Sequence, residues 1–137
     1  MVEDIPEGVD RLLLQDVESY EQLEVLLLLF EHPQQAFSTT TAAGALGMSE
    51  EAASTALDHL TLRGLLVSTE TGNQAAFRYG ALSADLDATI RTLQRVYAEK
   101  PAQIAKRMTA NAIERVRTAA IRTFSDAFLL RGKKDDG

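Results

Sequence analysis

Apolar residues recur at helical spacing through most of the chain, and short stretches rich in Ser, Thr, Gly or Pro separate the runs. The pattern predicts a first short helix over Val9–Val17. A second helix is predicted from a cap at Ser19 to about Phe30, before Pro33. Because apolar residues surround most of this second helix, we expect it to lie at the centre of the core.

The middle of the chain predicts short strands and short helices. Phe37-Ser38 is expected to form a short strand, followed by a brief helix over Thr41–Leu46 that Thr39 or Thr40 caps. Two β-prone runs, Leu65–Thr69 and Ala75–Tyr79, flank a Gly-Asn turn. Such a pair of runs predicts a β-hairpin.

One further helix is predicted between these segments. Gly47 suits the backbone of a tight turn, Ser49 suits an N-cap, and Gly64 suits a helix end. The apolar residues between them share one helical stripe: Ala53, Ala56, Leu57 and Leu60.

This stretch resembles the winged helix-turn-helix of MarR-like transcriptional regulators, in which a Leu-Gly-Met-Ser turn precedes a recognition helix and Leu-x-x-Leu-x-x-Arg-Gly-Leu-Leu leads into the wing. The residues that carry the resemblance are Leu46, Gly47, Ser49, Leu57, Leu60, Arg63, Gly64, Leu65 and Leu66. It implies a mainly α fold with a small β-hairpin wing, formed by residues 1–82. A helical hairpin with a two-stranded flap is the alternative fold.

Residues 83–137 are predicted to form a helical arm. A first helix starts at Ser83, and its apolar stripe continues towards Pro101. From Pro101, apolar residues recur every four positions, as one helix or as two helices divided near Asn111. The end from Gly132 is expected to be disordered. A partner or a second copy is expected to cover the apolar stripe, whose main residues are Ile104, Met108, Val116, Phe124 and Phe128.

By the resemblance, the exposed side of the recognition helix contacts the DNA major groove and the wing contacts the neighbouring backbone. The recognition positions would be Ser49, Glu50, Glu51, Ser54, Thr55 and Asp58, with Asn73 and Arg78 on the wing. Family members usually carry basic residues here, whereas this chain carries three carboxylates. An acidic surface facing a polyanion disfavours tight DNA binding by this helix.

The charge of the chain is divided unevenly. Residues 1–90 hold three basic and fifteen acidic residues, a net charge of −12, whereas residues 91–137 hold eleven basic and five acidic residues, a net charge of +6. The composition is that of a globular domain, with 45% hydrophobic and 25% charged residues and no cysteine. We therefore expect a cytoplasmic protein with neither disulfides nor a membrane segment.

Residues suited to catalysis are scarce. His32 and His59 are the only histidines, neither has a metal-ligand spacing, and His59 is expected to be an exposed helix residue. Asp85 and Asp87 suit the positive end of a helix better than a catalytic pair. The sequence therefore predicts a non-enzymatic protein without cofactor or metal.

Two functions remain open from the sequence. One is a homodimeric transcriptional regulator, with the basic arm supplying phosphate contacts. The other is an acidic winged-helix adaptor that binds a protein partner and does not bind DNA directly. The basic arm would then pack on the partner or on the acidic head of a second copy, or it would present a solvated surface.

Overall fold

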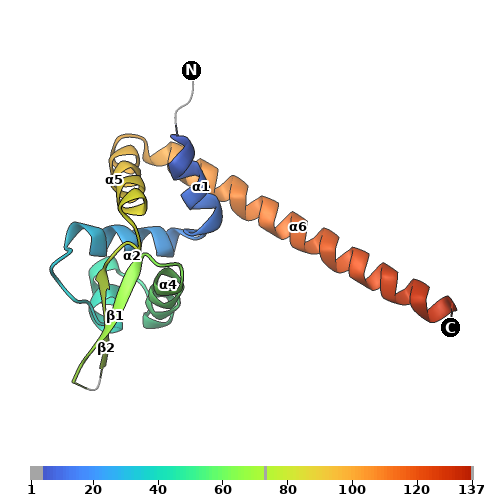
Figure 1. The fold of residues 1–137 in the computed structure, drawn as a ribbon, viewed down its shortest axis with the longest axis horizontal. Coiled ribbons are helices and arrows are strands. Elements are labelled where there is room, and N and C mark those ends of the chain that lie inside the picture. The colour runs from blue at the N-terminus through green and yellow to red at the C-terminus, as the bar shows by residue number, and fades with distance from the viewer. Residues whose placement is uncertain (1–4, 73, 137) are drawn as a thin grey trace.

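The computed structural model describes residues 5–72 and 74–136, including their side chains except those of residues 71 and 128–136. The described chain is mainly α with one two-stranded antiparallel sheet, as the sequence predicts (Figure 1). The elements are α1 (Glu7–Gln15), α2 (Tyr20–Glu31), α3 (Thr39–Leu46), α4 (Glu50–Leu62), β1 (Leu66–Thr71), β2 (Gln74–Tyr79), α5 (Ala84–Glu99) and α6 (Pro101–Asp136).

Helix α2 lies at the centre of the core, as expected from its apolar circumference. It packs against α3, α4 and β2, and Leu23, Leu26 and Leu29 are fully buried. The predicted cap is confirmed, because the Ser19 hydroxyl accepts a hydrogen bond from the backbone N–H of Gln22 at 3.1 Å. The Gln22 side chain reaches back one residue further than in a standard capping box and accepts from the N–H of Glu18.

Two predicted helix starts are corrected. Helix α3 begins at Thr39 because Ser38, rather than Thr39 or Thr40, is its cap and accepts from the N–H of Thr41 at 3.1 Å. Helix α1 begins at Glu7, directly after Pro6, whose φ of −56° already suits a helix. Glu7 and Gly8 precede Val9 and carry no apolar side chain, so apolar periodicity could not predict this first turn.

The hairpin of β1 and β2 is confirmed, with Leu66 opposite Tyr79 and Thr71 opposite Gln74. The turn is tighter than predicted, and Gly72 within it has a φ of +65°, which glycine adopts at low cost. The predicted strand at Phe37 is reduced to a single antiparallel bridge with Phe77.

Tyr79 joins the base of the hairpin to the helices. Its ring meets the ring of Phe30 edge-on, with 5.0 Å between centroids, and its hydroxyl donates to Asp87 at 2.6 Å. The Asp87 carboxylate also accepts from Arg91 at 3.0 Å. These two donors, Tyr79 first, hold the pKa of Asp87 below its usual value.

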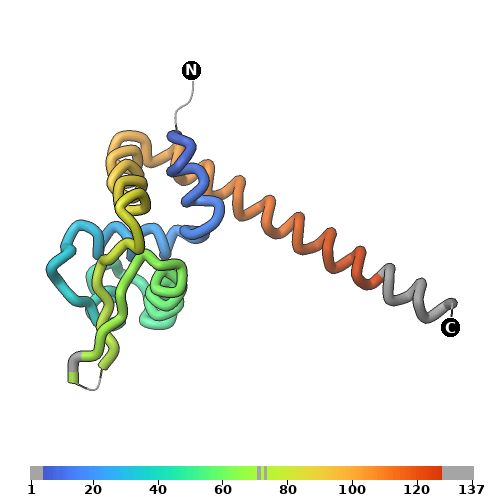
Figure 2. The backbone as a smooth tube through the Cα atoms, in the orientation of Figure 1, coloured from blue at the N-terminus to red at the C-terminus, as the bar shows by residue number. Residues whose placement is uncertain are grey.

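The hydrophobic core continues across residue 82, because α1, α5 and the first turns of α6 pack against one another. Ile90, Leu93 and Ile104 are fully buried in the same cluster as α2. The tube in Figure 2 shows α6 leaving the body beside α1 and running away from it. It is one continuous helix, unbroken near Asn111, and it continues past Gly132 to Asp136.

Candidate recognition surface and helical arm

The turn between α3 and α4 forms as the sequence predicts. Gly47 has a φ of +68°, which ends α3 in the left-handed region. The Ser49 hydroxyl then accepts from the N–H of Ala52 at 3.0 Å and starts α4. The local chemistry of these two residues therefore sets the direction in which α4 leaves α3.

Helix α4 has one buried and one exposed side. The predicted stripe is confirmed, since Ala53, Ala56, Leu57 and Leu60 are buried and the helix packs against α2 and α3. The predicted recognition residues lie off this stripe: Ser49, Glu50, Glu51, Thr55 and Asp58 are exposed and Ser54 is half-buried. Their contact with DNA or with a protein stays a prediction.

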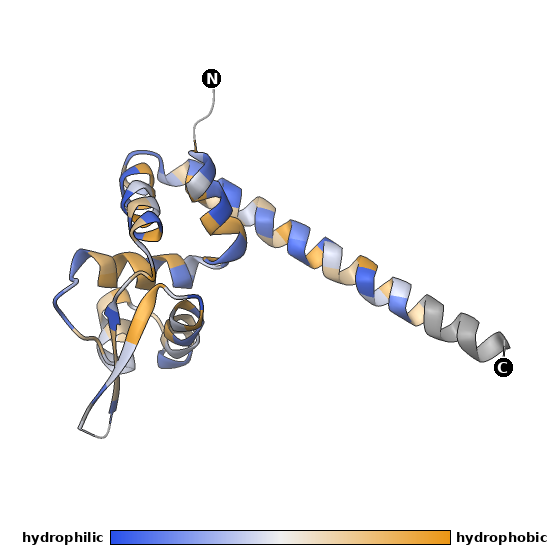
Figure 3. Cartoon of the chain, viewed as in Figure 1, coloured by the Kyte–Doolittle hydropathy of each residue, from blue (hydrophilic) through white to orange (hydrophobic). Residues whose placement is uncertain are grey.

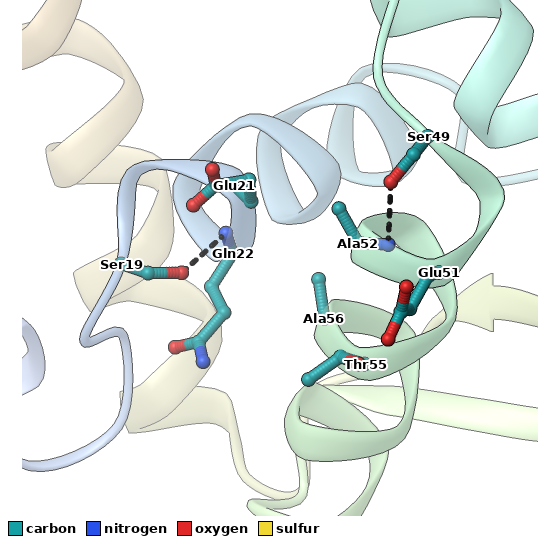
Figure 4. Close-up of a pocket in the computed structure, with 8 residues that line it drawn as sticks. All are labelled: Ser19, Glu21, Gln22, Ser49, Glu51, Ala52, Thr55 and Ala56. Carbon is teal, nitrogen blue, oxygen red and sulfur yellow. Dashed lines mark hydrogen bonds between the residues drawn. The ribbon is translucent and has the colours of Figure 1, made fainter.

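An open groove of about 300 Å³ lies between the first turns of α2 and α4 (Figure 4). Its lining residues are Ser19, Glu21, Gln22, Ser49, Glu51, Ala52, Thr55 and Ala56. Two helix N-termini meet here and contribute partial positive charge, but Glu21 and Glu51 bring full negative charges to the same groove. The groove is therefore a poor site for a phosphate. Glu21 belongs to a different helix, and linear spacing did not place it beside α4.

The exposed side of α4 is acidic, and no basic residue balances it nearby in the chain. From position 12 to position 62 the chain has no Lys or Arg and eight Asp or Glu. Within the described residues, Glu50, Glu51 and Asp58 form no ion pair. These carboxylates are exposed to solvent and no described cation lies against them, so the surface repels a polyanion.

The end of α4 is held to the loop between α1 and α2, which the sequence analysis missed. His59, predicted to be exposed, is half-buried, and its Nε2 lies 2.8 Å from the backbone oxygen of Asp16. Arg63 donates twice to the Asp16 carboxylate, from Nε at 2.9 Å and from Nη2 at 2.8 Å. Arg63 thus has a structural partner 47 residues away.

The hairpin adds little positive charge to this surface. Arg78 on β2 is exposed, as predicted, and it is the only basic residue of the described hairpin. Asn73, the other predicted wing residue, lies outside the described residues. Glu70 on β1 is also exposed and carries the opposite charge.

Part of the basic arm is engaged within the chain. Arg115 donates from Nη2 to the backbone oxygens of Leu13 and Leu14, at 3.2 and 2.7 Å. These carbonyls belong to the last turn of α1, which has no intrahelical donors for them. Arg107 pairs with Asp10 at 3.4 Å. These arginines therefore fix α6 to α1, and Arg115 is poorly placed to contact an outside phosphate.

The arm residues expected at a partner interface fall into two groups. Ile104 and Met108 are instead buried in the chain's own core, with 0% and 6% of their surface exposed. Val116 and Phe124 are 70% and 73% exposed, and their place in an interface stays a prediction. The side chain of Phe128 lies outside the described residues.

Two other features are absent from the described part of the chain. It holds no group of three or more His, Cys, Asp or Glu side chains arranged to bind a metal ion. None of its helices combines the length and the hydropathy needed to cross a membrane.

No protein-family model and no curated protein matches the sequence, but solved structures match the fold. MepR, a transcription regulator of the Staphylococcus aureus multidrug efflux pump MepA, superposes with a TM-score of 0.53 at 16% identity, over 88% of each chain. S. aureus MepR in a complex with DNA superposes with a TM-score of 0.53 at 17% identity, over 82% of this chain and 90% of MepR. Reduced HlyU from Vibrio cholerae superposes with a TM-score of 0.51 at 22% identity, over 66% of this chain and 90% of HlyU.

The fold is a winged helix-turn-helix. The resemblance found in the sequence is confirmed at this level. Within it α3, α4 and the hairpin of β1 and β2 occupy the places of the positioning helix, the recognition helix and the wing, and these names are used for them below. At these identities the superpositions establish the architecture alone, so the function of the recognition helix must be argued from this chain's own residues.

Proposed function

We propose that the protein is a non-enzymatic transcriptional regulator that acts as a homodimer and contacts DNA with its recognition helix and wing. One observation carries the proposal: the winged-helix fold presents α4 with its polar side uncovered, beside an exposed wing arginine. Ser49, Thr55 and Arg78 supply donors and acceptors suited to base edges and phosphates.

The acidity of α4 limits how such a regulator binds. Most non-specific affinity for DNA comes from Lys and Arg on phosphates, and each lost contact weakens binding and flattens its salt dependence. With Glu50, Glu51 and Asp58 on the recognition surface, we expect weak non-specific binding and dependence on a specific site. Two copies bound to adjacent half-sites would multiply the small affinity of each.

A second candidate function is an adaptor that binds a protein instead of DNA. The observation that favours it is the absence of Lys and Arg from position 12 to position 62, together with the unpaired carboxylates on α4. A surface of this kind attracts a basic protein segment as strongly as it repels phosphate.

Fluorescence anisotropy with mixed-sequence duplex DNA at low and physiological salt tests the two functions. A regulator binds at low salt with a steep inverse salt dependence. Arg78→Ala is expected to reduce the log–log salt slope by about 1 per copy. Replacing Glu50 and Glu51 by Gln is expected to strengthen binding by about 30-fold at low salt, since each of the two charges contributes about 1 kcal/mol of repulsion.

The matched control is Arg11→Ala, which removes an exposed arginine from α1 whose described ion pair is with Glu7 on its own helix. It is expected to leave the salt slope unchanged. Absence of binding at low salt by both the parent protein and the Gln variant would overturn the DNA-binding proposal. The adaptor function would then take its place.

A further inference from the structure

The residues of α4 that point directly away from the core form one narrow stripe. At 100° per residue, the direction about 180° from the mean of the four buried residues of α4 is shared by Glu51, Thr55, Asp58 and Leu62. All four are exposed. Figure 3 shows hydrophilic residues on α4 beside the more hydrophobic α2. In a recognition helix that enters a groove, this outward stripe comes nearest to the base edges.

Glu50 is exposed as well, but it does not belong to the outward stripe. It precedes Glu51 by one residue, so its direction differs by about 100° and lies nearer to the buried side of α4. The two neighbouring glutamates carry the same charge in the same turn of the helix. They therefore differ mainly in direction.

Helix α4 lacks the side chains that most often read purines. Arg and Lys bind guanine, and Asn and Gln bind adenine, each through hydrogen bonds to the major-groove edge. None of these four residue types occurs from Glu50 to Leu62. Arg63, the next residue, donates from Nε and Nη2 to the Asp16 carboxylate. The arginine closest to the recognition helix is thus already engaged within the chain.

Glu51 occupies the position from which base reading is most direct. It lies in the first turn of α4, and the N-terminal residues of a recognition helix are the ones that contact base edges. A carboxylate only accepts hydrogen bonds, so it pairs only with a base that presents a donor. In the major groove these donors are the N4 amino group of cytosine and the N6 amino group of adenine.

Cytosine fits a carboxylate better than adenine does. The adenine amino group lies beside N7, an acceptor that repels a carboxylate, whereas the cytosine amino group lies beside a C–H. Guanine presents the two acceptors N7 and O6, and thymine presents the acceptor O4 and a methyl group. Of the four bases, cytosine alone presents a donor to Glu51 without an adjoining acceptor.

Thr55 supplies a second contact of a different kind. It follows Glu51 by one turn on the outward stripe, about 6 Å along the helix axis. This distance corresponds to about two base-pair steps of 3.4 Å. The threonine methyl group suits the methyl group of thymine. The outward stripe therefore favours a cytosine and a nearby thymine.

We propose that Glu51 determines sequence specificity by accepting a hydrogen bond from the N4 amino group of a cytosine, with Thr55 on a thymine methyl group within two base pairs. This rests on the proposed DNA-binding function and names the base that it requires. The carboxylate that weakens non-specific binding then supplies specificity, because guanine in place of that cytosine sets two acceptors against it. Loss of the cytosine is expected to weaken binding by about tenfold.

Selection from a duplex library with a randomised central segment tests the assignment, with the full-length protein at low salt and sequencing of the bound DNA. The decisive variant is Glu51→Gln, because Gln binds N6 and N7 of adenine. The parent protein is expected to enrich sites with a cytosine at one position. Glu51→Gln is expected to change the preference there from cytosine to adenine, by about tenfold, and to leave the other positions unchanged.

The matched control is Glu50→Gln, which removes an equal charge beside the outward stripe. It is expected to strengthen binding to all sequences alike and to keep the cytosine preference. Glu51→Ala is a second variant, expected to lose that preference without gaining another. Circular dichroism checks that each variant keeps the helical content of the parent.

Failure of the base assignment and failure of DNA binding give different results. Enrichment of no sequence by the parent or by either Gln variant overturns the DNA-binding function itself. Enriched sites whose base preferences are the same for the parent and for Glu51→Gln overturn only the assignment of Glu51, which would then act through charge alone. The same change from cytosine to adenine in Glu50→Gln would also overturn that assignment.

Discussion

The recognition helix and the arm are both exposed helices, yet their surfaces impose different requirements. The exposed surface of α6 includes large apolar residues, with Val116 70% exposed, whereas the exposed side of α4 carries Glu50, Glu51 and Asp58. An apolar stripe gains free energy from any well-fitting cover, because release of water is non-directional. A charged surface is already stable in water and shows only which partners it repels. The arm therefore favours being covered by another surface, whereas the recognition helix restricts which partners can bind it.

Val116→Asp is the change with the largest expected effect on this comparison. A carboxylate inside a homodimer interface formed by the arm would be desolvated twice, once in each copy, and we expect the dimer to weaken by at least roughly 100-fold. Light scattering over a range of concentrations measures the change in mass. Thr118→Asp, on the opposite side of the same turn, is the matched control and should remain dimeric. A Val116→Asp protein that keeps a dimeric mass would contradict an interface at this part of the arm.

Arg115→Ala tests how much the contact between α6 and α1 contributes to stability. It removes two hydrogen bonds to the last carbonyls of α1, so we expect the free energy of unfolding to fall by about 1–3 kcal/mol. Urea unfolding followed by circular dichroism measures the loss. Arg117→Ala removes an exposed arginine whose described ion pair is a local one with Glu114, and a change within about 0.5 kcal/mol is expected there. Equal losses in the two variants would show that the α1 contact contributes little.

Glu50→Gln tests a smaller effect, the interaction of a carboxylate with the positive end of α4. Glu50 lies in the first turn of α4, where a carboxylate interacts favourably with the positive end of the helix. We expect its replacement to lower the free energy of unfolding by about 0.3–1 kcal/mol. Asp58→Asn, further along the same surface, lacks this interaction and is expected to leave stability nearly unchanged or slightly higher. A larger loss at Asp58 would mean that this carboxylate has a structural role of its own.

The sequence predicted the parts of the fold that local chemistry determines. Gly47, Ser49 and Gly64 set the turn and the limits of the recognition helix, because backbone preference and capping act within a few residues. The same reasoning chose the wrong residue among neighbouring cap candidates, because Ser38, rather than Thr39 or Thr40, is the cap of α3. Adjacent hydroxyl residues differ too little for spacing alone to choose between them.

Contacts between distant segments could not be predicted from the sequence. His59 meets Asp16 across 43 positions, and Arg115 meets Leu13 across 102. The periodicity of a sequence does not predict such contacts, because they depend on how whole helices pack against one another. The four-residue spacing of the arm was misleading for a related reason. It advances by 40° at each step, so Ile104 and Phe124 share a numerical pattern without sharing a surface.

The loop from Asp16 to Ser19 connects the recognition helix to the arm, because side chains of both contact it. His59 and Arg63, at the end of the recognition helix, contact Asp16 of this loop. Arg115 of the arm contacts Glu18 of the loop and the adjoining end of α1. One loop therefore links the recognition helix to the arm within a single copy. In a homodimer joined through the arms, a relative shift of one helical turn, about 5.4 Å, would change the distance between the two recognition helices without altering the fold of either copy.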